Sequence, residues 1–455
     1  MKKIKSILFY IALFLLPVTI SVVGVLEPSS IFTFLLFFLA TLLLHKLVFG
    51  SISKDIFITY SYYSFCAICF AAFHFITYGQ YFDLGGNPAQ IGGDDLRYSI
   101  EALTGVPYRI GHESLLPYSN LLRLFSLGIS LFKEPNHIDL LMVNVLAISF
   151  VPIFVSKFSN LLFAHKDASR ASFFLTLFCP ILLVNSVILY RDGWTALFFI
   201  ATLYFIFSKK YLLAFCFLIG EVYLRMGGGL LLFFITGVLL YRQFLKYRTY
   251  LELKVIMAMS SIVVIGLVLL IANPYILKYI AEKMGEDILF RTSFVVKHMI
   301  PAVSEQGVES GMVALYTAPL PIRLFGGFLF FFVAPTFSLN SLYSVHGIFW
   351  LKQFVVLIFP FMMLFYIVWF IRGGMYAIKK RDKDTMLLFV IYLFSILVIS
   401  QMSLQIRHKV MFMPLFYVLV SYGFCFKSKI GMQLGLITSA GLFILQFCYV
   451  GLRFM

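Results

Sequence analysis

The chain has 455 residues, of which 61% are apolar and only 12% are charged. Its mean hydropathy of +0.97 excludes an ordinary soluble globular protein. The formal net charge is +16, but the basic residues flank apolar runs, so they indicate orientation in a membrane and contact with anionic lipid. No nucleic acid partner is needed to explain them. The six cysteines lie in or beside apolar segments and suggest no disulfide framework.

Apolar runs long enough to cross a hydrocarbon core as helices recur along the whole chain. They lack the strict alternation of a transmembrane β-barrel. We therefore expect an all-α polytopic membrane protein with about 13 transmembrane helices, forming a single integral membrane domain over residues 1–455. The expected spans are residues 7–25, 31–45, 56–77, 138–156, 171–189, 193–208, 211–224, 229–241, 255–273, 353–371, 385–401, 410–426 and 430–450.

The charge pattern predicts the orientation. The short basic start before residues 7–25 lacks a signal-peptide cleavage site, so we expect a retained first helix and a bacterial inner-membrane protein. With the amino terminus in the cytoplasm, most basic residues fall on the inner side. Two long periplasmic loops then follow, at 78–137 and 274–352, each bearing surface or re-entrant helices.

The inner basic residues are mostly lysine, whereas the outer ones are mostly arginine. Orientation requires only charge, but the planar arginine fork binds phosphate or carboxylate through two hydrogen bonds. This asymmetry favours an oxyanion site on the periplasmic face. Interfacial anchoring of long side chains is the alternative explanation.

The most informative motif lies in the first long loop and reads Gly92-Gly93-Asp94-Asp95-Leu96-Arg97-Tyr98. Asp94 or Asp95 is expected to cap a short surface helix whose apolar side faces the membrane. Arg97 and Glu101 would lie one turn apart on another face. A simple cap needs only one aspartate, so the pair indicates catalysis, with Arg97 and Tyr98 as substrate contacts.

Further candidates for substrate binding lie elsewhere on the expected outer side. Arg109, His112 and Glu113 precede residues 117–132, which we interpret as a second surface helix or a partial re-entry. Ordinary solvation of a loop explains these three residues equally well.

Two arginines stand at the ends of middle spans. Asp192 can cap the helix that follows it, but Arg191 has no such structural role. Glu221 and Arg225 are spaced i,i+4 beside three glycines, so Glu221 is expected to hold Arg225 while Arg225 binds a ligand. A purely local ion pair is the alternative.

Two basic positions come late in the chain. Arg323 begins the apolar stretch 324–338, which is interpreted as re-entrant because both of its flanks must stay outside. Arg407 and His408 belong to a basic turn before a later span, where they face either a phosphate or water.

These residues, in this order, resemble the integral membrane glycosyltransferases of the GT-C superfamily. The similarity is to bacterial members that act on polyprenyl-linked sugars, including O-antigen-polymerase-like proteins. The resemblance implies that the acidic motif with Asp94 and Asp95 supplies the catalytic carboxylate. It also matches Arg191-Asp192 at the start of a middle helix, and a late basic motif, Arg407-His408-Lys409, ahead of Met413-Pro414.

The function so implied is transfer of a sugar or oligosaccharide from a polyprenyl-(pyro)phosphate donor to an acceptor in surface polysaccharide assembly. Asp94 is the first choice as base and Asp95 the second. Arg191, Arg225 and Arg407 would stabilise the anionic leaving group. No cofactor is required, although two adjacent aspartates could also bind a divalent metal.

The expected partners are the lipid-linked donor, a saccharide acceptor, the bilayer and other polysaccharide-assembly proteins. Two other functional classes stay open: a flippase or transporter of lipid-linked saccharide, and a non-catalytic scaffold. Charges gathered at one face and the absence of an evident repeat favour the enzyme over a transporter.

Overall fold

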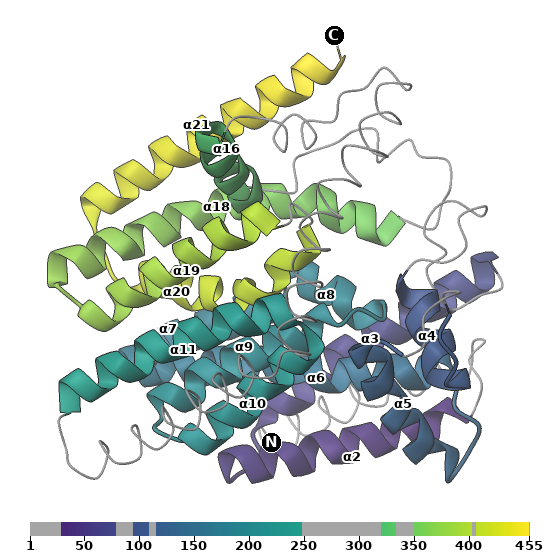
Figure 1. The fold of residues 1–455 in the computed structure, drawn as a ribbon. Coiled ribbons are helices and arrows are strands. Elements are labelled where there is room, and N and C mark those ends of the chain that lie inside the picture. The colour runs from purple at the N-terminus through teal and green to yellow at the C-terminus, as the bar shows by residue number, and fades with distance from the viewer. Residues whose placement is uncertain are drawn as a thin grey trace, which may run out of the picture. The chain divides into compact units, whose positions relative to one another are not determined.

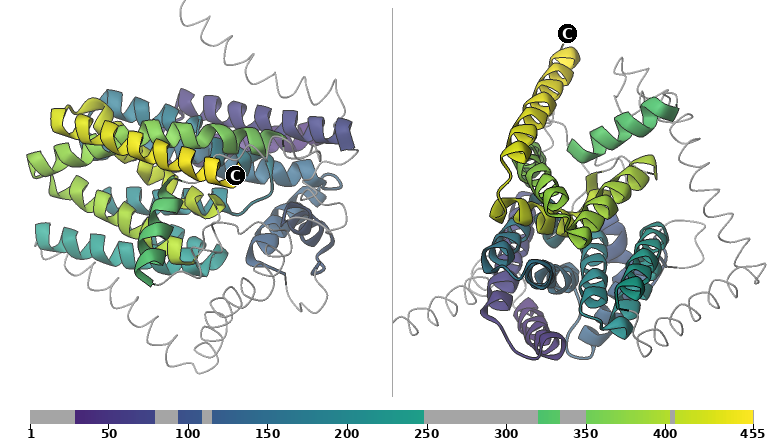
Figure 2. Two further views of the ribbon diagram at one scale, coloured as in Figure 1. Left: turned by 90° about the horizontal axis from the view of Figure 1, so that it is seen from above. Right: turned by 90° about the vertical axis from the view of Figure 1, so that its left-hand side faces the viewer.

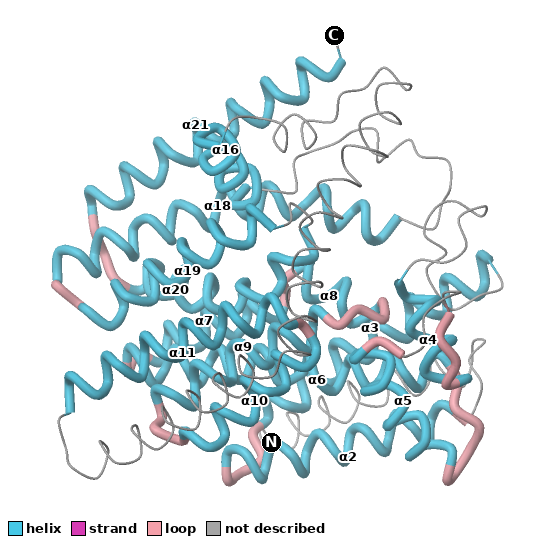
Figure 3. Tube along the Cα trace, viewed as in Figure 1, coloured by secondary structure: helices cyan, strands magenta, loops and turns pink. Residues whose placement is uncertain are grey.

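The computed structural model describes residues 29–78, 94–108, 115–247, 320–333, 350–402 and 406–454. Within these ranges every element is a helix and no strand occurs, so the all-α prediction is confirmed there (Figures 1 and 3). The helices are α2 (Ser30–Phe49), α3 (Lys54–Tyr78), α4 (Asp94–Thr104), α5 (Pro117–Ser130), α6 (His137–Phe163), α7 (Lys166–Leu177), α8 (Pro180–Val187), α9 (Asp192–Phe207), α10 (Tyr211–Leu224), α11 (Met226–Tyr247), α16 (Leu320–Val333), α18 (Trp350–Lys380), α19 (Lys383–Met402), the 3-10 helix η3 (Ile406–Phe412), α20 (Met413–Cys425) and α21 (Lys429–Phe454).

Several helices have the length and composition of membrane spans. In the described part of the chain, eight are long and apolar enough to cross a bilayer, and α7 with α8 would make a ninth as one bent span. Helices α9 and α10 are apolar but shorter. The expected spans 7–25 and 255–273 lie outside the described residues. A multi-pass membrane protein is therefore supported, whereas the count of about 13 stays a prediction.

The expected span at 171–189 is bent rather than one straight helix. The chain forms two helices, α7 and α8, that meet at an angle of 48°. Pro180 is the first residue of α8, and proline cannot donate the backbone hydrogen bond that would continue α7. The Tyr63 hydroxyl donates to the carbonyls of Thr176 and Leu177, at 3.4 and 3.2 Å, which provides a partner for carbonyls freed by the break.

The chain forms two compact units. The larger lies within Met1–Leu232, Val333–Tyr392 and Ile406–Met455, and the smaller within Phe233–Phe332 and Leu393–Gln405. In the larger unit, the long helices run alongside one another (Figure 2).

Helix α6 is the centre of the larger unit, because it contacts α2, α3, α5, α7, α8, α9 and α20. It begins with a capping box, in which the Asn136 side chain and the Asp139 carboxylate each accept a hydrogen bond from the other residue's backbone N–H. This box fixes where α6 starts, close to the site described below.

The helix connections at one end of the larger unit are rich in lysine, and this end is here called the basic end. Ring contacts place the helix connections there together: Phe49 contacts Tyr204, Phe163 contacts Tyr422, and His165 and Tyr376 contact Phe426. The basic residues in or beside these connections are Lys46, Lys54, Lys166, Lys209, Lys210, Lys380, Arg381, Lys383, Lys427 and Lys429. The orientation expected from charge would place this end on the cytoplasmic side, and that stays a prediction.

Helices α18 and α20 cross with their backbones in close contact. A Cβ added at Gly423 would lie 1.8 Å from the carbonyl oxygen of Trp369, so this position has no room for a side chain. Small residues allow such close packing between membrane helices.

We expect Gly423→Ala to lower the free energy of unfolding by about 1–3 kcal/mol, because the added methyl forces the two helices apart. Gly441→Ala is the matched control, since nothing lies within 4 Å of a Cβ at that helical position. Thermal unfolding of the purified protein in detergent measures both variants. Equal midpoints for the two would contradict the close crossing.

Candidate functional site

Helix α4 begins at Asp94, so both aspartates are in its first turn and neither precedes it as the expected cap; the Asp94 side chain lies outside the described residues. Its polar residues face the protein interior: Asp95, Arg97, Ser99 and Glu101 are all buried. The apolar residues Leu96, Ile100 and Leu103 are each partly exposed. The acidic motif is therefore packed into the protein, and the side of α4 that carries these three apolar residues is the one left partly exposed.

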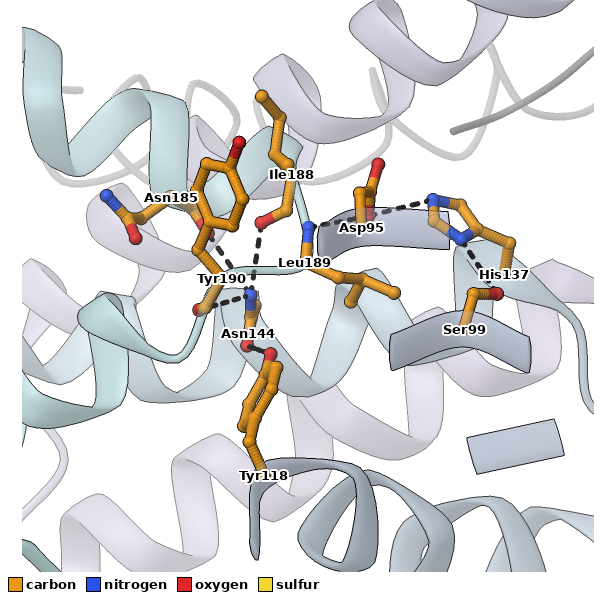
Figure 4. Close-up of polar contacts among 9 residues, drawn as sticks. All are labelled: Asp95, Ser99, Tyr118, His137, Asn144, Asn185, Ile188, Leu189 and Tyr190. Carbon is orange, nitrogen blue, oxygen red and sulfur yellow. Dashed lines mark hydrogen bonds and ion pairs between the residues drawn. The ribbon is translucent and has the colours of Figure 1, made fainter. Parts of the chain in front are cut away.

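Asp95 joins the acidic motif to the segment between α8 and α9. Its Oδ1 accepts a hydrogen bond of 2.8 Å from the Leu189 backbone N–H (Figure 4). His137, the first residue of α6, places Nε2 3.8 Å from the same oxygen, and its Nδ1 lies 3.1 Å from the Ser99 hydroxyl. Asp95 is only 2% exposed. Its carboxylate therefore lies in the protein interior, in contact with the Leu189 N–H and with the His137 ring.

Asn144 binds the same segment from the other side. Its amide Nδ2 donates to the carbonyl oxygens of Asn185, Ile188 and Tyr190 at 3.2–3.3 Å (Figure 4). Its Oδ1 accepts from the Tyr118 hydroxyl at 2.6 Å and from the Trp194 indole N–H at 3.2 Å. An amide nitrogen carries two N–H groups, so the three carbonyls share them, and the Ile188 carbonyl also accepts from the Tyr190 backbone N–H.

Tyr118 connects α5 to both acidic positions of the site. Besides its bond to Asn144, it interacts electrostatically with Asp95 and Asp192. Its ring also meets the Tyr98 ring edge-on, with centroids 4.8 Å apart. The first-loop motif and the Arg191-Asp192 pair therefore lie around one buried tyrosine.

Arg191 and Arg225 each bind a residue that is next to the other in the chain. Arg225 Nη1 lies 2.5 Å from Asp192 Oδ1, and Arg191 Nη1 donates to the Leu224 carbonyl at 3.3 Å. Each arginine thus reaches the turn to which the other belongs. The structure therefore brings Arg191, Asp192 and Arg225 together, and their binding of a ligand stays a prediction.

Two details of the expected pairing are wrong. Arg191, not Asp192, occupies the cap position of α9, and Asp192 is in its first turn, where the carboxylate is used to bind Arg225. Glu221 makes no hydrogen bond to Arg225 through its side chain. Both carboxylate oxygens of Glu221 are buried and without a hydrogen-bond partner among the described residues. Arg225, Asp192 and Arg191 still act on it electrostatically.

The late basic motif lies at the same end of the larger unit. A Cβ added at Gly228 would lie 2.7 Å from Glu221 Oε1 and 3.1 Å from Met411 Sδ, so η3 packs beside the start of α11. His408 is buried, and Lys409 of the same motif is fully buried. The Lys409 ammonium lies 5.5 Å from the centroid of the Phe359 ring.

Arg97 and Glu101 form the predicted i,i+4 pair, with Nε 2.8 Å from Oε1. Glu101 also accepts from the Ser119 hydroxyl and from the Tyr108 backbone N–H. Burial acts to raise the pKa of Glu101, but the bonds from Ser119 and Arg97, the arginine charge and the Tyr108 bond outweigh it and lower that pKa. This ionised carboxylate therefore links α4 to α5.

The remaining predicted site residues cannot be placed as side chains. Arg109, His112 and Glu113 lie outside the described residues. Arg323 in α16 and Arg407 in η3 have described backbones only. Within the described ranges, no group of three or more His, Cys, Asp or Glu residues could hold a metal ion.

Sequence reasoning missed the residues that assemble the site: Asn144, His137, Ser99 and Tyr118. Asn144 did carry a signal, because a buried amide inside an otherwise apolar span must find polar partners. Ser99 and His137 gave none, since their meeting depends on how α4 packs against the start of α6.

We expect Asn144→Leu to lower the free energy of unfolding by about 2–5 kcal/mol, because it leaves buried carbonyls, a hydroxyl and an indole N–H without partners. Asn160→Leu on the same helix is the control, since Asn160 is exposed. Thermal unfolding in detergent compares them. A stability of Asn144→Leu equal to that of the control would show that the amide does not hold this segment.

The lowered pKa of Glu101 predicts a pH-dependent contribution to stability. Because the folded pKa is below the ordinary value of 4.5, the contribution is complete above that value and is lost as pH falls through the folded pKa. Glu101→Gln should therefore unfold at a lower temperature than the native protein at pH 7, and this difference should narrow below pH 4.5. The exposed carboxylate of Glu134, changed to Gln, is the control. A difference that is constant over pH would refute the assignment.

In comparisons with protein-family models, curated proteins and solved structures, nothing matched this chain. The resemblance to GT-C glycosyltransferases stays a prediction from the motif residues.

Proposed function

We propose that this protein is an integral membrane glycosyltransferase or polymerase. It transfers a sugar or oligosaccharide from a polyprenyl-(pyro)phosphate donor to an acceptor in the assembly of bacterial surface polysaccharide. The observation that carries the proposal is the hydrogen bond from Leu189 N–H to Asp95, which joins the acidic motif to the Arg191-Asp192 pair. A base and an anion-binding group must lie close together for such a transfer.

The two aspartates have different roles in this proposal. Asp95 is buried and holds the α8–α9 segment, so it acts as an anchor. Asp94, the first residue of α4, is the base that takes the proton from the acceptor hydroxyl. The amino terminus of α4 favours the ionised form of a carboxylate at this position.

The arginines stabilise the leaving group. As the bond from the sugar to the donor phosphate breaks, negative charge develops on the phosphate, and guanidinium groups fixed beforehand stabilise that charge. Arg225 is already paired with Asp192. Among the described residues, Arg191 donates to a neutral carbonyl and forms no ion pair, which makes it the first choice for the phosphate.

A transporter of lipid-linked saccharide is the second candidate. The bend between α7 and α8 favours it, because many transporters place their sites at broken helices. The concentration of acids and arginines at one end of the larger unit favours the enzyme.

Reconstitution with a polyprenyl-linked saccharide separates the two classes. A product with more sugar units indicates transfer, whereas movement of the donor across the bilayer without bond change indicates transport. Movement without any product would contradict the proposed function.

We expect Asp94→Asn to lower the transfer rate by about 10²–10⁴-fold with little change in thermal stability, as for loss of a general base. Asp95→Asn keeps an oxygen that accepts from Leu189, so it should retain most of the activity. Asp95→Ala should lose both activity and thermal stability. A full loss of activity in Asp95→Asn with unchanged stability would instead make Asp95 the base.

A further inference from the structure

Arg372 of α18 is a buried cation near the basic end of the larger unit. It is only 9% exposed, its Nε has no hydrogen-bond partner, and among the described residues no carboxylate forms an ion pair with it. Burial of a charge without a counter-charge is costly. An anion supplied from outside the chain would remove that cost.

Aromatic side chains hold the Arg372 guanidinium in place. Its Cζ lies 5.0 Å from the centroid of the Trp369 ring, and Trp369 stacks on Phe424 with centroids 4.2 Å apart. A cation over an aromatic face is attracted to the ring, while the N–H groups at the guanidinium edge stay able to donate. The group is thus oriented before any ligand arrives.

The connection between α20 and α21 lies beside Arg372. A Cβ added at Gly431 would come within 2.8 Å of Arg372 Cα, so the start of α21 packs directly on α18. Lys427 and Lys429 are exposed in this connection, and the first turn of α21 has no acidic residue. These features add positive potential around the guanidinium.

Among the described residues, neither Asp382 nor Asp167 forms an ion pair with Arg372. Asp382 accepts from the Thr385 backbone N–H, the Thr385 hydroxyl and the Tyr422 hydroxyl. Asp167 and Arg372 both act electrostatically on the Cys425 thiol, but no ion pair joins them.

An exposed apolar surface continues from the same place. Phe365 is exposed, and its ring contacts both Trp369 and Phe424. Phe361 and Ile430 are also exposed. A guanidinium next to exposed aromatic and aliphatic side chains suits an amphiphile with an anionic head, rather than a free soluble anion.

We propose that Arg372, Trp369 and the α20–α21 connection form a binding site for the anionic headgroup of a membrane phospholipid. The phosphate accepts hydrogen bonds from the Arg372 guanidinium, and Lys427 and Lys429 add long-range attraction. The acyl chains lie along Phe365 and Phe424. This site is independent of the proposed transfer reaction.

The test uses the full-length protein, purified in detergent and stripped of lipid. Phosphatidylglycerol, phosphatidylcholine and glycerol 3-phosphate are titrated separately, and the thermal midpoint and native mass spectra are recorded. Phosphatidylglycerol is expected to bind and raise the midpoint, and the other two are not. Arg372→Gln is expected to weaken phosphatidylglycerol binding by at least about fivefold, the effect of one basic residue near anionic lipid.

A double variant, Lys427→Gln with Lys429→Gln, tests the site at the surface without disturbing the packing around Arg372. It should also bind phosphatidylglycerol more weakly. Lys209→Gln with Lys210→Gln removes the same charge from the exposed α9–α10 turn at the basic end and is the matched control, which should bind normally.

Unchanged affinity in Arg372→Gln would overturn the proposal. If that variant does not fold, unchanged affinity in the Lys427 and Lys429 double variant overturns it instead. Equal stabilisation by phosphatidylcholine would show that the site does not recognise an anionic headgroup, which would overturn the proposal. Equal stabilisation by glycerol 3-phosphate would show that the ligand is a soluble phosphate and not a lipid.

Discussion

The described architecture depends on how the short segment between α8 and α9 is held inside the protein. A helix ends there and another begins, so backbone groups without helical partners are buried together. Asn144 donates to three carbonyls around this segment, and Asp95 accepts from the N–H of Leu189. Because buried backbone groups need partners, these two side chains fix the path of the chain immediately before Arg191.

Several other features follow from that constraint. Asp95 must enter the protein interior to reach Leu189, so α4 is buried on all but the side that carries Leu96, Ile100 and Leu103. Once α4 is packed in this way, Arg97 and Glu101 are buried as well, and each requires the other as a partner. Ser119 on α5 then adds a hydroxyl donor to Glu101. The described contacts form two sets: Asp95 and Ser99 meet at His137, and Glu101 joins Arg97 to Ser119. Removing either Arg97 or Glu101 alone would leave the other as a buried charge without its partner.

The sequence predicted those features that depend on local spacing. Hydropathy located the helices, the aspartates marked the start of α4, and i,i+4 spacing paired Arg97 with Glu101. The same rule misled at Glu221 and Arg225, because Arg225 binds Asp192, which lies 33 positions earlier in the chain. Spacing along one helix cannot reveal a partner on the next, since that depends on helix packing. The break before Pro180 was readable, because proline at that position cannot continue a helix.

Arg225 and Arg372 show how surroundings decide what a buried arginine can do. Asp192 neutralises Arg225 within the chain, so this guanidinium can position its neighbours without any ligand. Arg372 has an aromatic ring in place of a carboxylate, and an aromatic face compensates a buried charge only in part. A cation so placed gains more from an external anion than a paired one does. The charges of these two arginines are therefore neutralised differently. A carboxylate of the protein neutralises Arg225, whereas we propose that a lipid headgroup neutralises Arg372 at the other end of the larger unit.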